Sequence, residues 1–387
     1  MKITRVRSLP INLTFKSPYP EDSIGHGDLH RTVIVVIETD DGLFGIGEAT
    51  PWSPLDLGLT PGYLHEVITD YYAPALVGHD PRDVTRLHEL MDTRIYGSIG
   101  LAAAKGAIDC ALYDVVGKAL GVPVVELIGG RVRDKLPALV GMGIDTPEAM
   151  ATEAKMLVDR FRVKFIKVKI GGGRIHGTWP ARTVPQLDIE RLEHVRAALP
   201  DDVTIIADSN QGYYSPGDAI RVIKALDIAP CMFEQPVDGT DLDGLERVAR
   251  SVDVPIIVDE GAYTPARLLS VLRRVPVAAV NIKPSRAGGF YGSLQMIRMV
   301  EAAGLKCTVD CILESRIGGA MIAHLAATVR EDAYLATAAT LVSDLWLADD
   351  HYWTGAGAGI VDGHFAAPDG PGLGLNVSPK FLELFHD

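Results

Sequence analysis

Short apolar segments that recur after residue 135 constrain the fold of this chain more than any other feature of its sequence. They return roughly every 25 to 35 residues, with amphipathic segments between them. Near-continuous apolar strands that alternate with helices are typical of a parallel sheet buried on both faces. Eight such units in succession predict a closed β/α barrel. We expect the strands at residues 136–143, 165–170, 203–208, 231–235, 255–259, 277–283, 305–310 and 333–338.

The first part of the chain has a different pattern. Residues 1–60 contain the β-branched run 31–38, followed by the turn Asp40-Asp41-Gly42, so we expect a hairpin-rich antiparallel sheet. From about residue 64 to residue 128 the apolar positions change to a helical period. A sheet followed by helices is typical of an α+β unit. The sequence therefore predicts an α/β protein in which an N-terminal α+β capping domain precedes the barrel.

The length of the chain agrees with this division, because 387 residues exceed the usual size of one compact domain. We expect the capping domain at residues 1–130 and the barrel at residues 131–350. The glycine-rich segment 351–387 is expected to pack back on the capping domain.

Charge and cysteine content limit the functions that this chain can have. A net charge of −13 without a basic block argues against nucleic acid or an anionic membrane surface as a partner. We expect no signal peptide, because residues 1–7 are charged and alternating and do not lead into an apolar core. We also expect no membrane span, because no uninterrupted apolar stretch reaches the necessary length. The four cysteines are scattered and form no C-x-x-C pair, which is typical of reduced thiols in a cytoplasmic enzyme.

Lys167 and Lys169 flank a single valine in the apolar run Phe165–Ile170. Residues two apart in a strand point to the same face, so two ammonium groups are expected side by side in buried surface. Like charge and desolvation both lower the pKa of a lysine, which would let one of the two act as a general base near neutral pH. The alternative is an exposed edge strand whose lysines prevent edge-to-edge pairing.

An acidic residue directly follows the apolar part of three successive strands: Asp208, Glu234 and Asp259. In a β/α barrel these strand ends meet at one rim, where chemistry takes place. Three carboxylates at one rim would repel one another unless a cation lay between them, and all-oxygen ligands select a hard ion such as Mg²⁺. Asn210 and Glu260 lie one or two positions further on and are expected to orient these ligands. The alternative is that each acid only caps the helix that follows it.

The sixth expected strand contains Asn281 and ends at Lys283. The second and sixth strands lie on opposite sides of an eight-stranded barrel, so Lys169 and Lys283 would face each other across the ion. Two bases on opposite faces of one carbon can remove a proton from one side and return it on the other, which is what racemisation requires. The alternative is that Lys283 is a surface lysine, although the run before it is apolar throughout.

Together, these residues and three phrases resemble the enolase superfamily, and specifically its muconate lactonizing enzyme subgroup in the mandelate racemase/muconate lactonizing enzyme family. The phrases are Asp208-Ser209-Asn210-Gln211-Gly212, Phe233-Glu234-Gln235-Pro236 and Leu313-Glu314-Ser315-Arg316-Ile317-Gly318. The resemblance implies Mg²⁺, with Mn²⁺ as an alternative, held by Asp208, Glu234 and Asp259. It also implies that Lys169 and Lys283 are the acid/base pair, and that Lys167 contacts the substrate carboxylate and lowers the pKa of Lys169. Glu314 matches the family's seventh-strand acid, whose role varies among members.

The expected reaction is metal-assisted removal of the α-proton of a small carboxylate substrate through an enediolate intermediate. Enolase-superfamily sites with a lysine or histidine base and Mg²⁺ are themselves a known example of this pattern. We expect a racemase or epimerase of an amino-acid derivative that forms a homo-oligomer. A cycloisomerase of the muconate-lactonizing type and a dehydratase remain alternatives.

The resemblance implies that the loops of the capping domain and the eighth strand determine which substrate is bound. His26 and Asp28 in a capping loop are expected to contact the distal part of the substrate, unless they are merely solvated. Dipeptide epimerases of the family carry an Asp-x-Asp pair after the eighth strand. In this chain residues 337–341 read Thr-Ala-Ala-Thr-Leu, which argues against a dipeptide substrate. The loop at 171–187 is longer than the family pattern and either lines the site or lies on the surface.

Two other classes of protein are less consistent with the sequence. A nicotinamide-dependent oxidoreductase needs G-x-G-x-x-G between a strand and a helix, and the glycines at 355, 357 and 359 do not have that spacing. A binding protein that lost its activity would have little reason to keep both the acid/base pair and three ligands.

Overall fold

The computed structural model describes residues 1–16, 29–51, 59–95, 101–171, 185–338, 347–348, 353–354 and 359–384. Its N-terminal part begins with a three-stranded antiparallel sheet in the order β1-β2-β3, formed by β1 (Ile3–Thr14), β2 (Leu29–Thr39) and β3 (Phe44–Ala49). The turn between β2 and β3 follows from Gly42, whose φ of 82° favours glycine, and from a hydrogen bond of Thr39 to Asp41.

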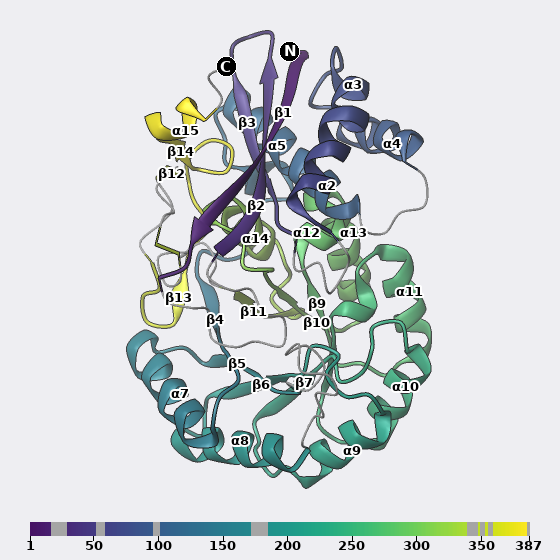
Figure 1. The fold of residues 1–387 in the computed structure, drawn as a ribbon, viewed down its shortest axis with the longest axis vertical. Coiled ribbons are helices and arrows are strands. Elements are labelled where there is room, and N and C mark those ends of the chain that lie inside the picture. Colours follow the sequence, from purple (N-terminus) through teal and green to yellow (C-terminus); the bar gives the residue numbers. More distant parts are fainter. Residues whose placement is uncertain are drawn as a thin grey trace.

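Helices cover one face of this sheet (Figure 1). They are α2 (Pro61–Glu66), η1 (Val67–Tyr72), α3 (Ala73–Leu76), α4 (Val84–Arg94), α5 (Ala102–Leu120) and α6 (Val124–Leu127). Helix α5 lies directly against β3, because Gly45 and Gly47 have no side chain there. A Cβ at Gly47 would lie 1.9 Å from the carbonyl oxygen of Ala107. These glycines therefore let the sheet and the helix approach closely.

Eight parallel strands follow and close into a barrel, as the sequence predicts. They are β4 (Leu136–Met142), β5 (Phe165–Lys169), β6 (Thr204–Asp208), β7 (Cys231–Glu234), β8 (Ile256–Val258), β9 (Ala279–Ile282), β10 (Lys306–Val309) and β11 (Tyr334–Ala338). Closure comes from the parallel pairing of β11 with β4, in which Thr337 lies opposite Ala138. Because every barrel strand has two neighbours, β5 is not the exposed edge strand of the alternative hypothesis.

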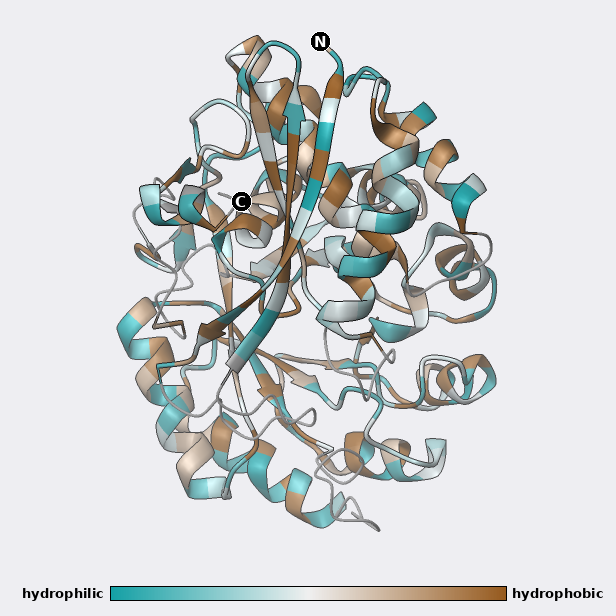
Figure 2. Ribbon diagram, turned by 45° about the horizontal axis from the view of Figure 1, so that its top comes forward, coloured by the Kyte–Doolittle hydropathy of each residue, from teal (hydrophilic) through white to brown (hydrophobic). Residues whose placement is uncertain are grey.

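The helices between the strands form the outer layer of the barrel. They are α7 (Pro147–Phe161), α8 (Pro185–Ala198), α9 (Pro216–Ala225), α10 (Leu242–Ser251), α11 (Pro265–Arg274), α12 (Pro284–Ala287), α13 (Gly289–Ala302) and α14 (Arg316–Ala327). Several of them carry hydrophobic residues on one side and hydrophilic residues on another (Figure 2).

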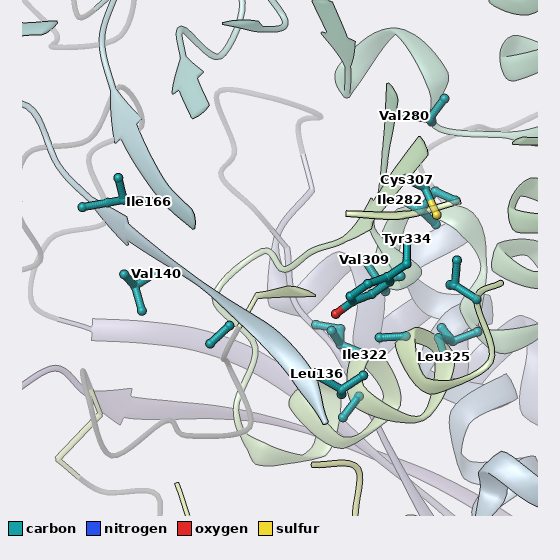
Figure 3. Close-up of a cluster of buried hydrophobic side chains, with 14 of the residues drawn as sticks. Leu136, Val140, Ile166, Val280, Ile282, Cys307, Val309, Ile322, Leu325 and Tyr334 are labelled. Atoms are coloured by element: carbon teal, nitrogen blue, oxygen red, sulfur yellow. The ribbon is translucent and has the colours of Figure 1, made fainter. Parts of the chain in front are cut away.

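Alternation along the strands divides the barrel side chains into two sets. On β5, Ile166 and Val168 point outward and join the large apolar layer between strands and helices, part of which is drawn in Figure 3. Phe165 points inward against a small interior cluster of Leu139, Ile206, Ile257, Ala279 and Ala336. Lys167 and Lys169 follow Phe165 on the inward face. The two-residue period of the strand therefore places them beyond this interior apolar cluster, toward the carboxyl end of the barrel.

The C-terminal segment contains β12 (Trp353–Thr354), β13 (His364–Phe365), β14 (Asn376–Val377) and α15 (Pro379–Glu383). Strand β13 pairs antiparallel with β4, and the backbone N–H of Leu373 donates to Asp114 of α5 at 2.8 Å. The segment thus contacts the barrel as well as the first domain. In the part of the chain that the structure describes, no helix has the length and apolar character needed to span a bilayer. All four cysteines are free thiols.

Candidate active site

The two lysines of β5 lie inside the barrel, each against carboxylates. Lys167 Nζ donates to Glu234 Oε1 at 2.8 Å and to Asp310 Oδ2 at 2.5 Å, and it lies 3.6 Å from Asp208 Oδ2. Lys169 Nζ donates to Asp208 Oδ2 at 2.6 Å and to Asn210 Oδ1 at 2.5 Å. Both side chains are therefore held by hydrogen bonds that are assisted by charge.

The environment of Lys167 corrects one expectation from the sequence. Burial lowers its pKa, but the carboxylates of Asp310, Glu234 and Asp208 raise it by more, so the pKa lies well above the usual value for lysine. A lysine whose pKa falls toward neutrality because of a like charge was expected at one of the two positions. Lys167 is therefore not that lysine, because the carboxylates that surround it outweigh the effect of burial. The role of Lys169 as the base stays a prediction.

The three strand-end carboxylates are fully buried at the carboxyl ends of β6, β7 and β8. Asp208 lies opposite Glu234 in the pairing of β6 with β7, and Asp259 directly follows β8. Burial would raise the pKa of Asp208, but Lys169, Lys167 and Lys283 lower it to about 2. Burial and the nearby charge of Asp208 raise the pKa of Glu234 to about 7. The group is thus a row of buried acids that repel one another and are compensated by lysines.

The capping alternative for these acids does not account for the row. Asp259 precedes a short 3₁₀-helix at Glu260–Ala262 but makes no capping hydrogen bond with its side chain. Asp208 Oδ1 does accept a hydrogen bond from the backbone N–H of Asn210 at 3.0 Å, while Oδ2 is engaged by Lys169. One carboxylate oxygen therefore orders the turn after β6, and the other takes part in the site.

The carboxylate oxygen atoms of this row are the type of donor that a hard divalent cation prefers. Within the described ranges, no three His, Cys, Asp or Glu side chains converge closely enough to hold a metal ion. Glu234 Oε2 is buried and has no hydrogen-bond partner, as is Glu260 Oε2. An unsatisfied carboxylate oxygen in a low-dielectric interior is costly, and a bound cation would compensate for it.

Lys283 follows β9 on the opposite side of the barrel from β5, since three strands lie between β5 and β9 in either direction around the closed sheet. Its Nζ donates to Asp259 Oδ2, and its side chain is buried, which contradicts the surface-lysine alternative. Burial lowers its pKa, but the carboxylates of Asp259 and Glu260 raise it, and the pKa lies above the usual value. Lys169 and Lys283 thus bind the two ends of one row of acids.

Amide side chains fix the positions of the acids. Asn210 Nδ2 donates to Glu260 Oε1 at 3.0 Å, and Asn281 Nδ2 donates to Glu234 Oε1 at 2.7 Å. Both residues were expected around the site from the sequence. Gln235 was not expected: its Oε1 accepts hydrogen bonds from the backbone N–H groups of Asp259 at 2.9 Å and of Gly261 at 3.0 Å, which orients the turn after β8.

Asp310 is a fourth acid of this site that the sequence analysis did not identify. It directly follows Val309, the last residue of β10, and accepts hydrogen bonds from Lys167 and Asn281. Burial would raise its pKa, but Lys167 and Lys283 lower it below the usual value. The signal that located the other three acids, a carboxylate directly after an apolar strand, was present in the sequence here as well.

Glu314 lies near the site but is turned toward helix α12. Its Oε1 accepts a hydrogen bond from Ser285 Oγ at 2.5 Å, and its Oε2 accepts one from the backbone N–H of Ile312 at 2.6 Å. Burial is the main cause that raises its pKa to about 7. Ser285 lies two residues after Lys283, so Glu314 braces the helix that begins at the catalytic candidate.

Several candidates from the sequence fall on residues outside the described ranges. These are His26, Asp28, the larger part of the 171–187 loop and residues 339–341 after the eighth barrel strand. Their placement at the site stays a prediction.

Both halves of the chain match models of known families. Residues 13–129 match the mandelate racemase/muconate lactonizing enzyme N-terminal domain, and residues 149–381 match the enolase C-terminal domain-like family. The N-succinyl-L-Arg/Lys racemase of Bacillus cereus is 28% identical over 99% of this chain and 97% of the relative. Its crystal structure covers 99% of this chain and 98% of that chain, with a TM-score of 0.89.

Two further relatives differ in reaction. The hydrophobic dipeptide epimerase of Enterococcus faecalis is 31% identical over 84% of this chain and 87% of the relative. Its structure in complex with Mg and the dipeptide L-Leu-L-Tyr has a TM-score of 0.85, covers 97% of this chain and 99% of that chain, and is 29% identical. A chloromuconate cycloisomerase of Delftia acidovorans is 28% identical over 97% of each chain.

These relatives are isomerases, and the matches extend over the capping sheet and helices as well as the barrel with its acids and lysines. The chain therefore belongs to the mandelate racemase/muconate lactonizing enzyme family of the enolase superfamily and is an isomerase.

Proposed function

We propose that this protein racemises or epimerises an amino-acid derivative, with Lys169 and Lys283 as the acid/base pair that removes a proton from the α-carbon of a carboxylate substrate and returns another. The observation that carries this proposal is the placement of the two lysines on opposite strands, at the two ends of one row of buried acids. One lysine removes the proton from one face of the α-carbon. The other donates a proton to the opposite face, so the configuration inverts.

The ion required for this chemistry would be held by Asp208, Glu234 and Asp259, with Mg²⁺ as the preferred ion and Mn²⁺ as the alternative. When bound, the divalent ion supplies positive charge that stabilises the negative charge developing on the substrate carboxylate. Support comes from the all-oxygen donor set, from the unsatisfied Glu234 Oε2, and from the Mg complex of the related epimerase.

Proton transfer requires one of the two lysines to be neutral while the other is protonated. In this structure the carboxylates of Asp259 and Glu260 favour the charged form of Lys283. Carboxylates that are occupied as ligands offer less negative charge to a neighbouring ammonium group. Lys283 would then release a proton more readily, which prepares it for acid/base work.

The relatives support an amino-acid derivative as the substrate class, because one racemises N-succinyl-Arg/Lys and another epimerises hydrophobic dipeptides. A second candidate is cycloisomerisation, which the match to a chloromuconate cycloisomerase over 97% of the chain supports. Cycloisomerisation needs one proton transfer at one face, whereas racemisation needs both lysines. The requirement for the second lysine therefore separates the two candidates.

The test is exchange of the α-hydrogen in deuterated water, measured by mass spectrometry and chiral chromatography. The substrate panel comprises N-acyl amino acids, dipeptides, betaines, hydroxyprolines and lactones. With a racemase, solvent label enters both enantiomers, and activity disappears with a chelator and returns with Mg²⁺. Lys169→Ala and Lys283→Ala should each lower racemisation by about a hundredfold or more, while each still exchanges the enantiomer whose proton faces the remaining lysine.

The matched control is Lys164→Ala, since Lys164 lies just before β5 but is solvent-exposed and paired with Asp202. It should retain full activity. Full turnover in Lys169→Ala, or equal exchange of both enantiomers in either active-site variant, would refute the two-base proposal.

Two other expectations, a homo-oligomer and a cytoplasmic location, stay predictions. Sedimentation velocity tests the first, because a mass at a multiple of the 41.6 kDa chain is expected.

A further inference from the structure

A second buried carboxylate network joins the capping sheet to the barrel through Glu48. This residue lies near the end of β3 and is fully buried. Its carboxylate accepts hydrogen bonds from Ser315 Oγ at 2.7 Å, from the backbone N–H of Ser315 at 3.1 Å and from the backbone N–H of Gly318 at 3.0 Å. A single side chain of the first domain therefore satisfies three donors at the start of α14.

The same carboxylate also accepts hydrogen bonds from the capping domain itself. Thr32 Oγ1 donates to Glu48 Oε1 at 2.9 Å, and Thr50 Oγ1 donates to it at 3.3 Å. Thr32 lies three residues after the start of β2, and Thr50 directly follows β3. Glu48 thus ties the beginning of β2 and the end of β3 to one point on the barrel.

On the barrel side this point is close to the proposed catalytic machinery. Ser315 follows Glu314, which accepts a hydrogen bond from Ser285 in the helix that begins after Lys283. Gly318 packs between the side chains of Glu314 and Glu48. A Cβ at this position would lie 2.3 Å from Glu314 Cβ and 3.3 Å from Glu48 Oε2. The network therefore runs without a gap from the capping strands to the loop that follows β10.

We propose that Glu48 is a positioning residue: it holds the beginning of β2 and the end of β3 against the loop after β10. Its loss should therefore weaken substrate binding more than it slows proton transfer. This inference rests on the proposed function. It also uses the expectation that the capping loops select the substrate, since the strand ends that Glu48 holds are continuous in sequence with those loops.

A purely structural role is the main alternative, and the chain offers a matched control for it. Asp109 of α5 is also fully buried and also bridges the two domains: it accepts hydrogen bonds from the backbone N–H of Phe290 at 2.6 Å and of Tyr291 at 3.3 Å, at the start of α13. Its side-chain partner is His88 of α4, at 2.8 Å. Asp109 thus has the same kind of contacts, but it does not hold the ends of β2 and β3.

The experiment compares Glu48→Gln with Asp109→Asn in the full-length enzyme loaded with Mg²⁺. Glu48→Gln should raise KM by about tenfold or more with kcat within about threefold of wild type, whereas Asp109→Asn should leave KM within about threefold. Ser315→Ala, which removes one of the donors, should raise KM in the same direction by a smaller factor. An unchanged KM in Glu48→Gln, or an equal rise in Asp109→Asn, would overturn the inference.

A readout that does not depend on activity separates this inference from the proposed function. Amide hydrogen exchange of residues 29–34, 47–51 and 315–319 should become faster in Glu48→Gln and stay unchanged in Asp109→Asn. If the wild-type enzyme turns over no substrate of the panel, the proposed function fails, and this exchange pattern alone decides the role of Glu48. Unchanged exchange in these three segments would overturn it.

Discussion

Asp310 and Lys167 form an ion pair inside the barrel, with 2.5 Å between Asp310 Oδ2 and Lys167 Nζ. The pair joins β5 to the end of β10. The hydrogen bond of Lys169 to Asn210, in contrast, joins β5 to the turn after β6. Because both groups are almost fully buried, breaking the pair would leave an uncompensated charge away from water. The pair therefore fixes the ammonium group that the family resemblance assigns to the substrate carboxylate.

Removal of this ion pair should destabilise the protein. Asp310→Asn leaves Lys167 buried with one charged partner fewer, and we expect the free energy of unfolding to fall by about 2 to 4 kcal/mol. Urea denaturation with and without Mg²⁺ measures it. The control is Asp202→Asn, which breaks the solvent-exposed pair with Lys164 and should leave stability unchanged within error. Equal effects of the two substitutions would contradict this account.

Removal of one proposed ligand should have opposite effects with and without metal. Burial and the charge of Asp208 raise the pKa of Glu234 to about 7, so at pH 8 its ionised form destabilises the metal-free fold. Glu234→Gln should therefore unfold at the same or a higher temperature than wild type in a chelator. Wild type should gain about 3 kcal/mol at an Mg²⁺ concentration near a hundred times its Kd, and the variant should gain far less.

Differential scanning fluorimetry with a chelator and with added Mg²⁺ measures both effects. Glu246→Gln, which alters an exposed carboxylate paired with Arg274, is the control and should show the wild-type response to Mg²⁺. A wild-type Mg²⁺ response in Glu234→Gln would remove this residue from the proposed ligand set.

His324 of α14 should make the stability of the protein depend on pH. Burial lowers its pKa from 6.5 to about 4, so between these values the unfolded chain binds a proton that the folded chain does not. Stability is then complete above about pH 6.5 and falls as the pH decreases toward about 4, by roughly 3 kcal/mol in all. Chemical denaturation across this range should show a shallower slope in His324→Gln. His194→Gln, at an exposed position, should keep the wild-type slope.

Close approach of β3 and α5 should make Gly47 intolerant of any side chain. A Cβ there would lie 1.9 Å from the carbonyl oxygen of Ala107, and the helix backbone cannot move aside without separating the two layers. Gly47→Ala should therefore lower the free energy of unfolding by about 3 kcal/mol or more. Gly62→Ala is the control, because the nearest atom to its Cβ would be 4.0 Å away in an exposed helix. Circular dichroism melts compare the two, and similar melting temperatures would contradict the steric explanation.

Much of the barrel and the general place of its chemistry could be predicted from the sequence, because both depend on local patterns. The apolar runs mark the strands, and the strand period alone puts Lys167, Lys169 and Phe165 on one face. An acid directly after an apolar strand marks a rim position, and Asp310 carries the same signal as Asp208. The residues could thus be located, but their partners could not.

Only the tertiary structure decided which charged groups meet. Asp310 reaches Lys167 across 143 positions of sequence, and Glu48 reaches Ser315 across 267. No local pattern encodes such pairs, since they arise only when closure of the barrel and docking of the capping sheet bring distant strand ends together. The sequence by itself therefore determined the strand periods and the chemical types at the rim. The three-dimensional fold determined the electrostatics, because the carboxylates that raise the pKa of Lys167 come from distant strands that meet only in the closed barrel.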